Sequence, residues 1–396
     1  MHCCIAGGGP AGMVLGMLLA RAGVNVLVLE KHADFLRDFR GDTIHPSTLE
    51  LMYELGMLED FLRRPHQEFR QLGAQIEEHV VTVADFSHLP THCRFVALMP
   101  QWDFLNFIAE KARLHPTFSL RMQAEVRDLL EDHGRIVGVR ATTPEGDLEV
   151  RAGLTVGADG RHSLVRQKAG FEVLDRGAPI DVLWMRLPRR ADDPSQTLGR
   201  FRTGKILVTL DRGDYWQCAY VIAKGAAEAL RARGLAAFRE DLAAVAPFLR
   251  DRVDVLQDWN DIKLLTVAID RLREWSREGL LCIGDSAHAM SPMGGVGINL
   301  AIQDAVAAAN LLARPLLDGP VTARQLRRVQ RRREFPTRVT QLFQVFVQRR
   351  YLGPALSIQA PLPRLPWPFR LLRAFPLLRR IPARMIGVGV RPEHVA

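Results

Sequence analysis

The glycine-rich segment at residues 7–12, Gly-Gly-Gly-Pro-Ala-Gly, most constrains what this chain can fold into. It follows an apolar run at residues 2–6 and opens a helical stretch at 13–22, and a second apolar run at 24–29 leads to Glu30. This is the order of a strand–helix–strand unit that binds a dinucleotide. There the glycines allow a tight turn, close approach of the pyrophosphate and close helix packing, and the acid accepts a hydrogen bond from the adenosine ribose. The helix start offers unpaired N–H groups to the pyrophosphate.

Two later segments repeat the pattern of an apolar strand followed by a glycine and an acid. Residues 154–160 contain Asp159, and residues 280–285 end on Asp285. Ligands of open α/β sheets bind at the carboxyl ends of the strands. A plain nicotinamide site has no use for an acid some 255 residues after Glu30, whereas FAD can use one acid for its adenosine ribose and another for its ribityl chain. The glycine-rich turn at 292–299, before a helix expected at 300–312, offers N–H groups to the flavin edge that gathers negative charge on reduction.

At these three motifs the chain resembles the single-component, FAD-dependent aromatic hydroxylases, the class A flavoprotein monooxygenases related to para-hydroxybenzoate hydroxylase. The resemblance covers about residues 1–340. It implies an oxidoreductase in which NADPH or NADH reduces FAD in a shared cleft. Reduced flavin then adds O2 to give a C4a-hydroperoxide, which hydroxylates an apolar, aromatic small molecule. The protein has to exclude bulk water, because the hydroperoxide otherwise decays to hydrogen peroxide.

The resemblance also places FAD contacts outside the three motifs. Arg40 matches an arginine that the family uses after the second strand, and Gln101 matches a contact at the start of a helix. Ser291 and Val296 depart from the family pattern, the first from a frequent proline pair and the second from a polar residue. The expected cofactor-binding residues are Gly7, Gly9, Ala11, Gly12, Glu30, Lys31, Arg40, Gln101, Val126, Asp159, Asp285, Pro292, Gly295, Gly297, Ile298 and Asn299.

The sequence constrains the catalytic residues less. It contains no second GxGxxG, no metal-ligand spacing and no nucleophile elbow, so we expect the flavin to supply the chemistry and expect no metal. We assign no catalytic base; the candidates beside the ring are His45, Pro292 and Met293, of which Met293 is the best candidate for touching substrate. His288 is interpreted as holding a turn. Alternate side chains of a strand face opposite sides of the sheet. An aromatic residue on an expected strand therefore has an even chance of lining the pocket, and these residues are Trp184, Phe201, Tyr215 and Trp216.

The order of elements predicts an α/β fold in which two domains are interleaved. A Rossmann-like FAD-binding domain is expected from residues 1–66, 94–171 and 279–322. A β-sheet substrate domain is expected from 67–93 and 172–278, with helical runs at 226–246 and a strand at 261–269. Residues 323–396 are expected to form a C-terminal helical, Arg-rich region.

The positive charge is concentrated in that C-terminal region. The chain carries +9 formal charges, and from Arg324 onward sixteen arginines accompany two glutamates, so this region carries +14 and the rest −5. The region lacks a nucleic-acid reader motif, and its arginines are interleaved with Leu, Phe, Trp and Pro. We expect short amphipathic helices packed on the body, keep peripheral membrane contact or an anionic substrate as alternatives, and expect no nucleic-acid partner.

Bulk properties favour a cytoplasmic enzyme. Five cysteines form no CxxC pair, and most lie in expected core strands, so we expect buried, reduced thiols. The first expected strand begins at residue 2, which leaves no room for a signal peptide, and no run of 18 apolar residues predicts a transmembrane segment.

Several alternatives stay open. A flavin-dependent epoxidase, a Baeyer–Villiger oxygenase and a flavin-linked reductase share these motifs, whereas the Trp-x-Trp-x-Ile-Pro run expected of flavin halogenases is absent. A non-catalytic flavin-binding module that senses redox state is the alternative from a different class. The expected co-substrate is NADPH or NADH, and the protein is expected to be a monomer or a homodimer.

Overall fold

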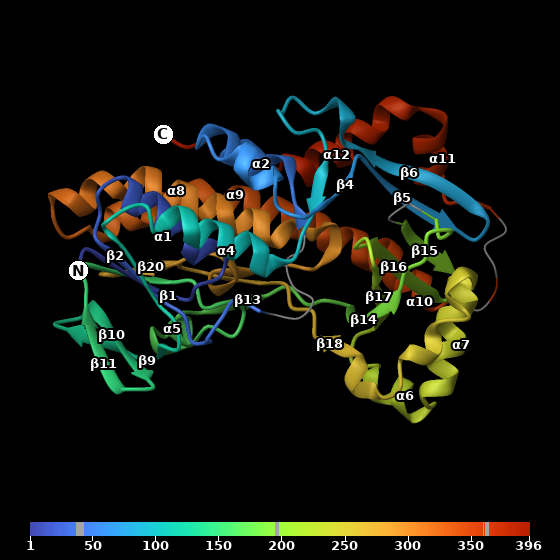
Figure 1. Cartoon of the computed structure of the whole chain (residues 1–396), viewed down its shortest axis with the longest axis horizontal. Helices are drawn as coiled ribbons and strands as arrows, with labels where there is room; N and C mark the ends of the chain where they lie inside the picture. Colours follow the sequence, from blue (N-terminus) through green and yellow to red (C-terminus); the bar gives the residue numbers. More distant parts are fainter. Residues whose placement is uncertain (37–42, 195–197, 359, 361–363) are drawn as a thin grey trace.

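The computed structural model describes residues 1–36, 43–194, 198–358, 360 and 364–396. It has the predicted α/β fold, with one large sheet at each end of the molecule (Figure 1). Two long helices, α8 (Val296–Asp318) and α9 (Ala323–Val347), run along the long axis and lie against each other.

The first sheet has six strands, and β1 lies near its centre. Its order is β20 (Ser276–Arg277), β21 (Leu280–Cys282), β12 (Leu154–Gly157), β1 (Cys3–Ala6), β2 (Val26–Leu29) and β8 (Phe118–Arg121). Strand β1 pairs in parallel with β12 and β2, so that Ala6 is in register with Gly157 and with Leu29. The carboxyl ends of these strands, and the motifs that follow them, therefore share one edge of the sheet.

Both faces of this sheet are covered. Cys3 and Ile5 pack among the helices α1 (Pro10–Arg21), α4 (Gln101–Ala112) and α8. Cys4 faces the opposite way and packs with the sheet of β9 (Glu125–Asp132), β10 (Arg135–Thr143) and β11 (Gly146–Arg151). By length and composition the segment Met293–Asp318 could span a membrane, but 72% of its most apolar stretch is buried inside the protein, against α1 and α9. It is a core helix.

The second sheet has seven strands and joins distant parts of the chain. Its order is β18 (Lys263–Leu265), β14 (Ile180–Pro188), β17 (Tyr215–Ala223), β16 (Lys205–Asp211), β15 (Leu198–Arg202), β5 (Gln71–Ile76) and β6 (His79–Asp85). Strands β5 and β15 pair in parallel, with Gly73 opposite Leu198. The helices α6 (Ala227–Ala232) and α7 (Leu235–Val245) pack on one face of the sheet.

Some elements differ from the sequence expectation in length. Helix α8 begins at Val296 rather than at residue 300, because Gly297 continues the helix instead of ending the turn. The helical run expected at 226–246 is interrupted at Gly234, whose φ of +87° lies outside the helical region. Strand β18 ends at Leu265, four residues early.

The C-terminal region begins with the long helix α9, and the helices that follow it are short. They are α10 (Gly353–Leu356), α11 (Trp367–Ala374) and α12 (Arg380–Gly387), and the last two lie against β6 (Figure 1). The division into domains stays a prediction: β7 (Val96–Leu98) pairs with both β3 (Thr43–Ile44) and β4 (Gln67–Phe69), which come from different predicted domains.

Candidate functional site

The turn between β1 and α1 needs its glycines for different reasons. Gly7 has a φ of +109°, and a Cβ there would lie 2.4 Å from the carbonyl oxygen of Ala158. A Cβ on Gly12 would lie 2.0 Å from the carbonyl oxygen of Gly7. A Cβ on Gly9 would meet no protein atom within 4 Å, so the packing of the chain does not demand glycine at this position. Close approach of a ligand would demand it, and α1 starts here without a side-chain cap on its N–H groups.

Glu30 is fixed at the end of β2 by the same turn. Its carboxylate accepts a hydrogen bond from the Gly8 N–H at 2.9 Å and another from the His32 N–H at 3.1 Å. The residue is 7% exposed. These two contacts orient the Glu30 carboxylate at the end of β2.

An ion pair joins the two other acid-bearing turns. Asp159 accepts hydrogen bonds from the Ser163 hydroxyl at 2.5 Å and from the Val165 N–H at 3.0 Å, which ties the turn to the next helix. Burial raises the pKa of Asp159 despite these hydrogen bonds, which lower it. Arg161 lies in the same turn, and its guanidinium is 3.6 Å from the carboxylate of Asp285.

The turn before α8 is held from both sides by polar side chains. Gly295 has a φ of +63°, and a Cβ there would lie 2.1 Å from the hydroxyl oxygen of Thr43. The Asn299 amide donates to the carbonyl oxygens of Thr43 (3.1 Å) and Gly295 (3.2 Å), and its oxygen accepts from the Thr48 hydroxyl at 2.7 Å and from the His45 N–H at 2.9 Å. The Asn299 side chain is therefore engaged within the protein, where it ties the start of α8 to Thr43, His45 and Thr48.

Gln344, on the buried side of α9, was missed from the sequence. Its amide donates to the carbonyl oxygens of Ser291 at 3.0 Å and Met293 at 3.1 Å, and its oxygen accepts from the Ser291 N–H at 3.1 Å. The residue sits on a helix that is mostly polar, and the sequence alone does not show that Gln341 and Gln344 are the buried glutamines of this helix. It fixes the backbone on both sides of Pro292.

His45 connects the turn before α8 to the C-terminal helix α12. It is 1% exposed, and its ring Nδ1 lies 2.7 Å from the carbonyl oxygen of Ile386. Because a carbonyl oxygen only accepts, Nδ1 carries the proton. Burial lowers the pKa of His45 from 6.5 to about 4.

The buried His45 predicts a pH-dependent stability. Between the unfolded pKa of 6.5 and the folded pKa of about 4, the unfolded chain binds a proton that the folded chain does not. The free energy of unfolding should therefore fall by about 2 kcal/mol between pH 7.5 and pH 5 from this group. Urea unfolding at both pH values measures the change. His45→Gln keeps a donor for Ile386 but does not titrate, so it should show a flatter pH dependence; an equal slope in both proteins would contradict the assignment.

His288 holds a turn, as the sequence suggested. Its ring Nε2 lies 2.6 Å from the Asp304 carboxylate, which also accepts from the Gly284 N–H at 3.0 Å and from the Arg333 guanidinium at 3.0 Å. All of these side chains are buried. The turn that carries Asp285 is thereby anchored to α8 and α9.

One cavity of about 1920 Å³ brings the predicted site residues together. It extends from the β1–α1 turn to the seven-stranded sheet. The predicted residues that line it are Gly7, Gly9, Ala11, Glu30, Lys31, His45, Gln101, Val126, Asp159, Asp285, Pro292, Met293, Gly295, Gly297 and Ile298. Gly12 and Asn299 are not among its lining residues, because both serve contacts within the protein. Arg40 lies outside the described residues.

The four aromatic candidates divide between the two faces of the seven-stranded sheet. Trp184 and Phe201 line the cavity, together with apolar residues of β14, β15, β16 and β17. Trp216 faces the helical side, where its indole N–H donates to Asp193 at 2.7 Å, and Tyr215 is not among the lining residues. Alternation along β17 puts Trp216 on the face opposite to Ala219 and Val221, which line the cavity. Within the described part of the chain, no group of three His, Cys, Asp or Glu side chains is placed to hold a metal ion.

Comparison with known proteins gives consistent relatives. The family described as "FAD binding domain" matches residues 1–342. The 6-methylpretetramide 4-monooxygenase of Streptomyces rimosus is 36% identical over 360 residues, which is 88% of this chain and 84% of that protein. The para-nitrophenol 4-monooxygenase of a Pseudomonas species is 25% identical over 336 residues, 80% of this chain and 79% of that protein. The OxyS anhydrotetracycline hydroxylase from Streptomyces rimosus has a similar fold, with a TM-score of 0.75, 23% identity and coverage of 98% of this chain and 76% of that one.

Proposed function

Because this chain belongs to the FAD binding domain family and is a flavoprotein monooxygenase, we propose that it uses NAD(P)H and O2 to hydroxylate a fused-ring aromatic compound. The observation that carries the proposal is one continuous cavity, which joins the β1–α1 turn to an apolar sheet face bearing Trp184 and Phe201. In this reaction NAD(P)H supplies two electrons, one oxygen atom enters the substrate and the other leaves as water.

The residues present fit FAD. Gly9 leaves open space in front of the uncapped start of α1, which suits a pyrophosphate, and Glu30 at the end of β2 suits the adenosine ribose. We assign Asp285 to the ribityl chain and the backbone from Pro292 to Gly297 to the flavin ring. FAD supplies the redox chemistry when bound. The chain supplies rigid turns, a cavity walled by apolar side chains and protection from bulk water.

The size of the cavity supports a substrate larger than one ring. Its volume of about 1920 Å³ exceeds the 300–1,000 Å³ typical of small-molecule pockets, which leaves room for a multi-ring compound beside FAD. The relative that is 36% identical is named for 6-methylpretetramide, and the neighbour in fold is named for anhydrotetracycline. These names support a phenolic fused-ring substrate.

The test is a comparison of phenols with one ring and with four. The FAD-loaded protein is mixed with NADPH or NADH and either para-nitrophenol or anhydrotetracycline as a probe, and NAD(P)H oxidation, O2 uptake and product mass are followed. We expect the four-ring probe to accelerate NAD(P)H oxidation and to gain one oxygen atom, with little response to the one-ring probe. Absence of any substrate-stimulated NAD(P)H oxidation across a wider panel of aromatic compounds would favour the redox-sensing alternative.

Glu30→Ala should weaken FAD binding by about 10- to 150-fold, because a hydrogen bond to a charged acceptor contributes about 1.5–3 kcal/mol. Titration of the apoprotein with FAD, followed by flavin fluorescence, measures the loss. Glu30→Gln retains an oxygen acceptor and should lose less. Equal affinity in Glu30→Ala and the unmodified protein would show that Glu30 does not contact the cofactor.

Asp159 and Asp285 should differ in their effects. Asp285→Ala should chiefly lower FAD affinity. Asp159→Ala should also slow reduction by NAD(P)H, because Asp159 orders the turn that holds Arg161 in the shared cleft. Stopped-flow reduction of FAD-saturated variants is the measurement. A rate in Asp159→Ala equal to that of the unmodified protein would remove this turn from NAD(P)H recognition.

A further inference from the structure

Some apolar side chains of helix α11 pack against the rest of the protein, and others are exposed to solvent. Phe369 and Leu372 pack against β5 and β6. Trp367, Leu371 and Phe375 follow one another at a spacing of four residues, and all three are exposed, Trp367 to 63%. Residues four apart lie on one side of a helix. Trp367 and Leu371 therefore form an apolar stripe next to the face that packs on the sheet, and Phe375 follows directly after the last residue of the helix.

The segment before and within α12 repeats this arrangement. Leu377 and Ile381 are four residues apart and exposed, whereas Ala383 is buried against the cluster around β6. We call Trp367, Leu371, Phe375, Leu377 and Ile381 the apolar rim. Trp367, Leu371 and Ile381 also line the cavity. The apolar rim is therefore continuous with the cavity wall at its opening to solvent.

The segment that carries the apolar rim contains basic side chains and no acidic ones. Residues 335–392 contain ten arginines and no aspartate or glutamate. Arg370, Arg373, Arg380 and Arg384 are exposed, and in the described part of the chain no acidic side chain forms an ion pair with them.

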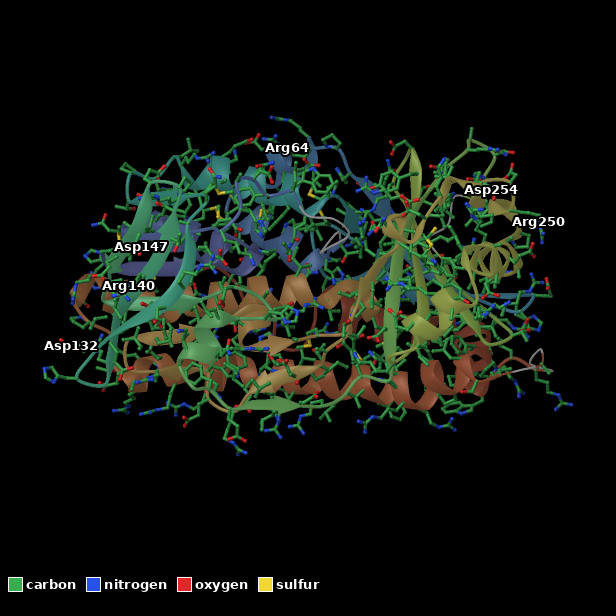
Figure 2. All side chains as sticks on the ribbon, turned by 90° about the horizontal axis from the view of Figure 1, so that it is seen from below. Arg64, Asp132, Arg140, Asp147, Arg250 and Asp254 are labelled. Carbon is green, nitrogen blue, oxygen red and sulfur yellow. The ribbon has the colours of Figure 1, made fainter. Side chains whose placement is uncertain are left out.

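At both ends of the molecule the two signs of charge are mixed, whereas the start of α9 carries the exposed arginines Arg324, Arg327, Arg328 and Arg331. Figure 2 shows Arg140 and Asp147 at one end of the molecule and Arg250 and Asp254 at the other. The Arg140 guanidinium lies 2.8 Å from the Glu149 carboxylate. At α11 and α12 the positive charge coincides with the exposed apolar side chains of the apolar rim.

We propose that the apolar rim and its arginines form a docking surface for an anionic phospholipid membrane. Helices that lie in a membrane interface combine Trp, Phe and Leu with arginines in this way, and a negative lipid surface attracts each arginine near it.

Charge complementarity selects this occupant. A second copy of the chain seated on the same face would oppose arginines to arginines, and a nucleic acid would leave the aliphatic side chains of the rim in water. Docking would place the cavity opening at the lipid surface, where apolar compounds concentrate. That consequence rests on the proposed function, but the docking does not.

Vesicle sedimentation of the FAD-loaded full chain tests the proposal. We expect binding to vesicles of phosphatidylcholine with phosphatidylglycerol, weak binding to phosphatidylcholine alone, and weakening of the binding by salt.

Arg370→Gln with Arg373→Gln should reduce partitioning by about fivefold for each arginine removed. Trp367→Ser with Leu371→Ser should also reduce it. Arg324→Gln with Arg328→Gln removes the same charge at the start of α9, far from the C-terminal helices (Figure 1), and is the matched control.

A second readout locates the contact. Lipids brominated in their acyl chains should quench tryptophan fluorescence, and Trp367→Phe should retain binding but lose most of the quenching, because the other tryptophans are less exposed. FAD absorbance and the unfolding temperature confirm that each variant is folded. If the matched control lost binding to the same extent, the net charge of the protein would explain the effect, and the proposal would be overturned. Binding to RNA or to an acidic protein without binding to anionic vesicles, or self-association through the same residues, would also overturn it.

Discussion

Replacing Asp304 with alanine should lower the free energy of unfolding by about 3–5 kcal/mol, the usual cost of removing one partner from a buried ion pair. Asp304 is fully buried and receives hydrogen bonds from His288, Arg333 and the Gly284 N–H. Its loss leaves the buried Arg333 with Glu393 as its remaining acidic partner, at 3.3 Å. The variant should also bind FAD more weakly, because the turn before Asp285 loses its anchor.

Urea unfolding measures the effect, and Asp318→Ala is the matched control. Asp318 lies on the same helix but pairs with Arg314 at the surface, so its removal should cost less than about 1 kcal/mol. Burial would raise the pKa of Asp304, but the charges of His288 and Arg333 and the hydrogen bonds outweigh it and hold this pKa below 3.8. The stabilisation is therefore present above the unfolded pKa and is lost as the pH falls through the folded pKa. A loss in Asp304→Ala no larger than in Asp318→Ala would contradict this account.

Met293→Asp should separate NAD(P)H oxidation from hydroxylation. Met293 lines the cavity beside Pro292, and a carboxylate there would lie among apolar residues of the cavity wall. An unpaired charge is costly in such a place, so it should keep water and disrupt substrate binding. The expected result is that NAD(P)H is still oxidised while most of the oxygen appears as hydrogen peroxide instead of product.

Met293→Leu is the control for this substitution. It keeps an apolar side chain of similar volume and should retain most of the coupling between NAD(P)H and product. Both variants should bind FAD, because Met293 contributes its backbone and not its side chain to the hydrogen bonds of the turn. If Met293→Asp hydroxylates substrate with normal coupling, the substrate does not contact this residue.

The sequence predicted the parts of the site that depend on local patterns. Gly7, Glu30, Asp159 and Asp285 each follow an apolar strand, and parallel strands bring their carboxyl ends to one edge. The structure places all four around one cavity. The roles assigned to them stay predictions.

Other parts depend on contacts that no local pattern encodes. Whether Trp184 or Trp216 lines the cavity depends on which face of the sheet the helix α7 covers. The strands carry apolar residues on both faces, so the sequence does not indicate which face this is. The hydrogen bond from His45 to Ile386 joins residues 341 positions apart. The role of Gln344 follows only from the packing of α9 against the turn at Ser291, where its amide donates a hydrogen bond to the Ser291 carbonyl oxygen.

The ion network at Asp304 also bears on how the chain folds during synthesis. Glu393, which pairs with Arg333, follows Asp304 by 89 positions. At about 5–20 residues per second, a ribosome needs roughly 4 to 18 s to make that stretch. Through this interval a nascent chain has the strands of the first sheet but lacks the residue that completes the pairing of Arg333. The final stabilisation of the turn before Asp285 is therefore delayed until the C-terminal region has been translated and has docked.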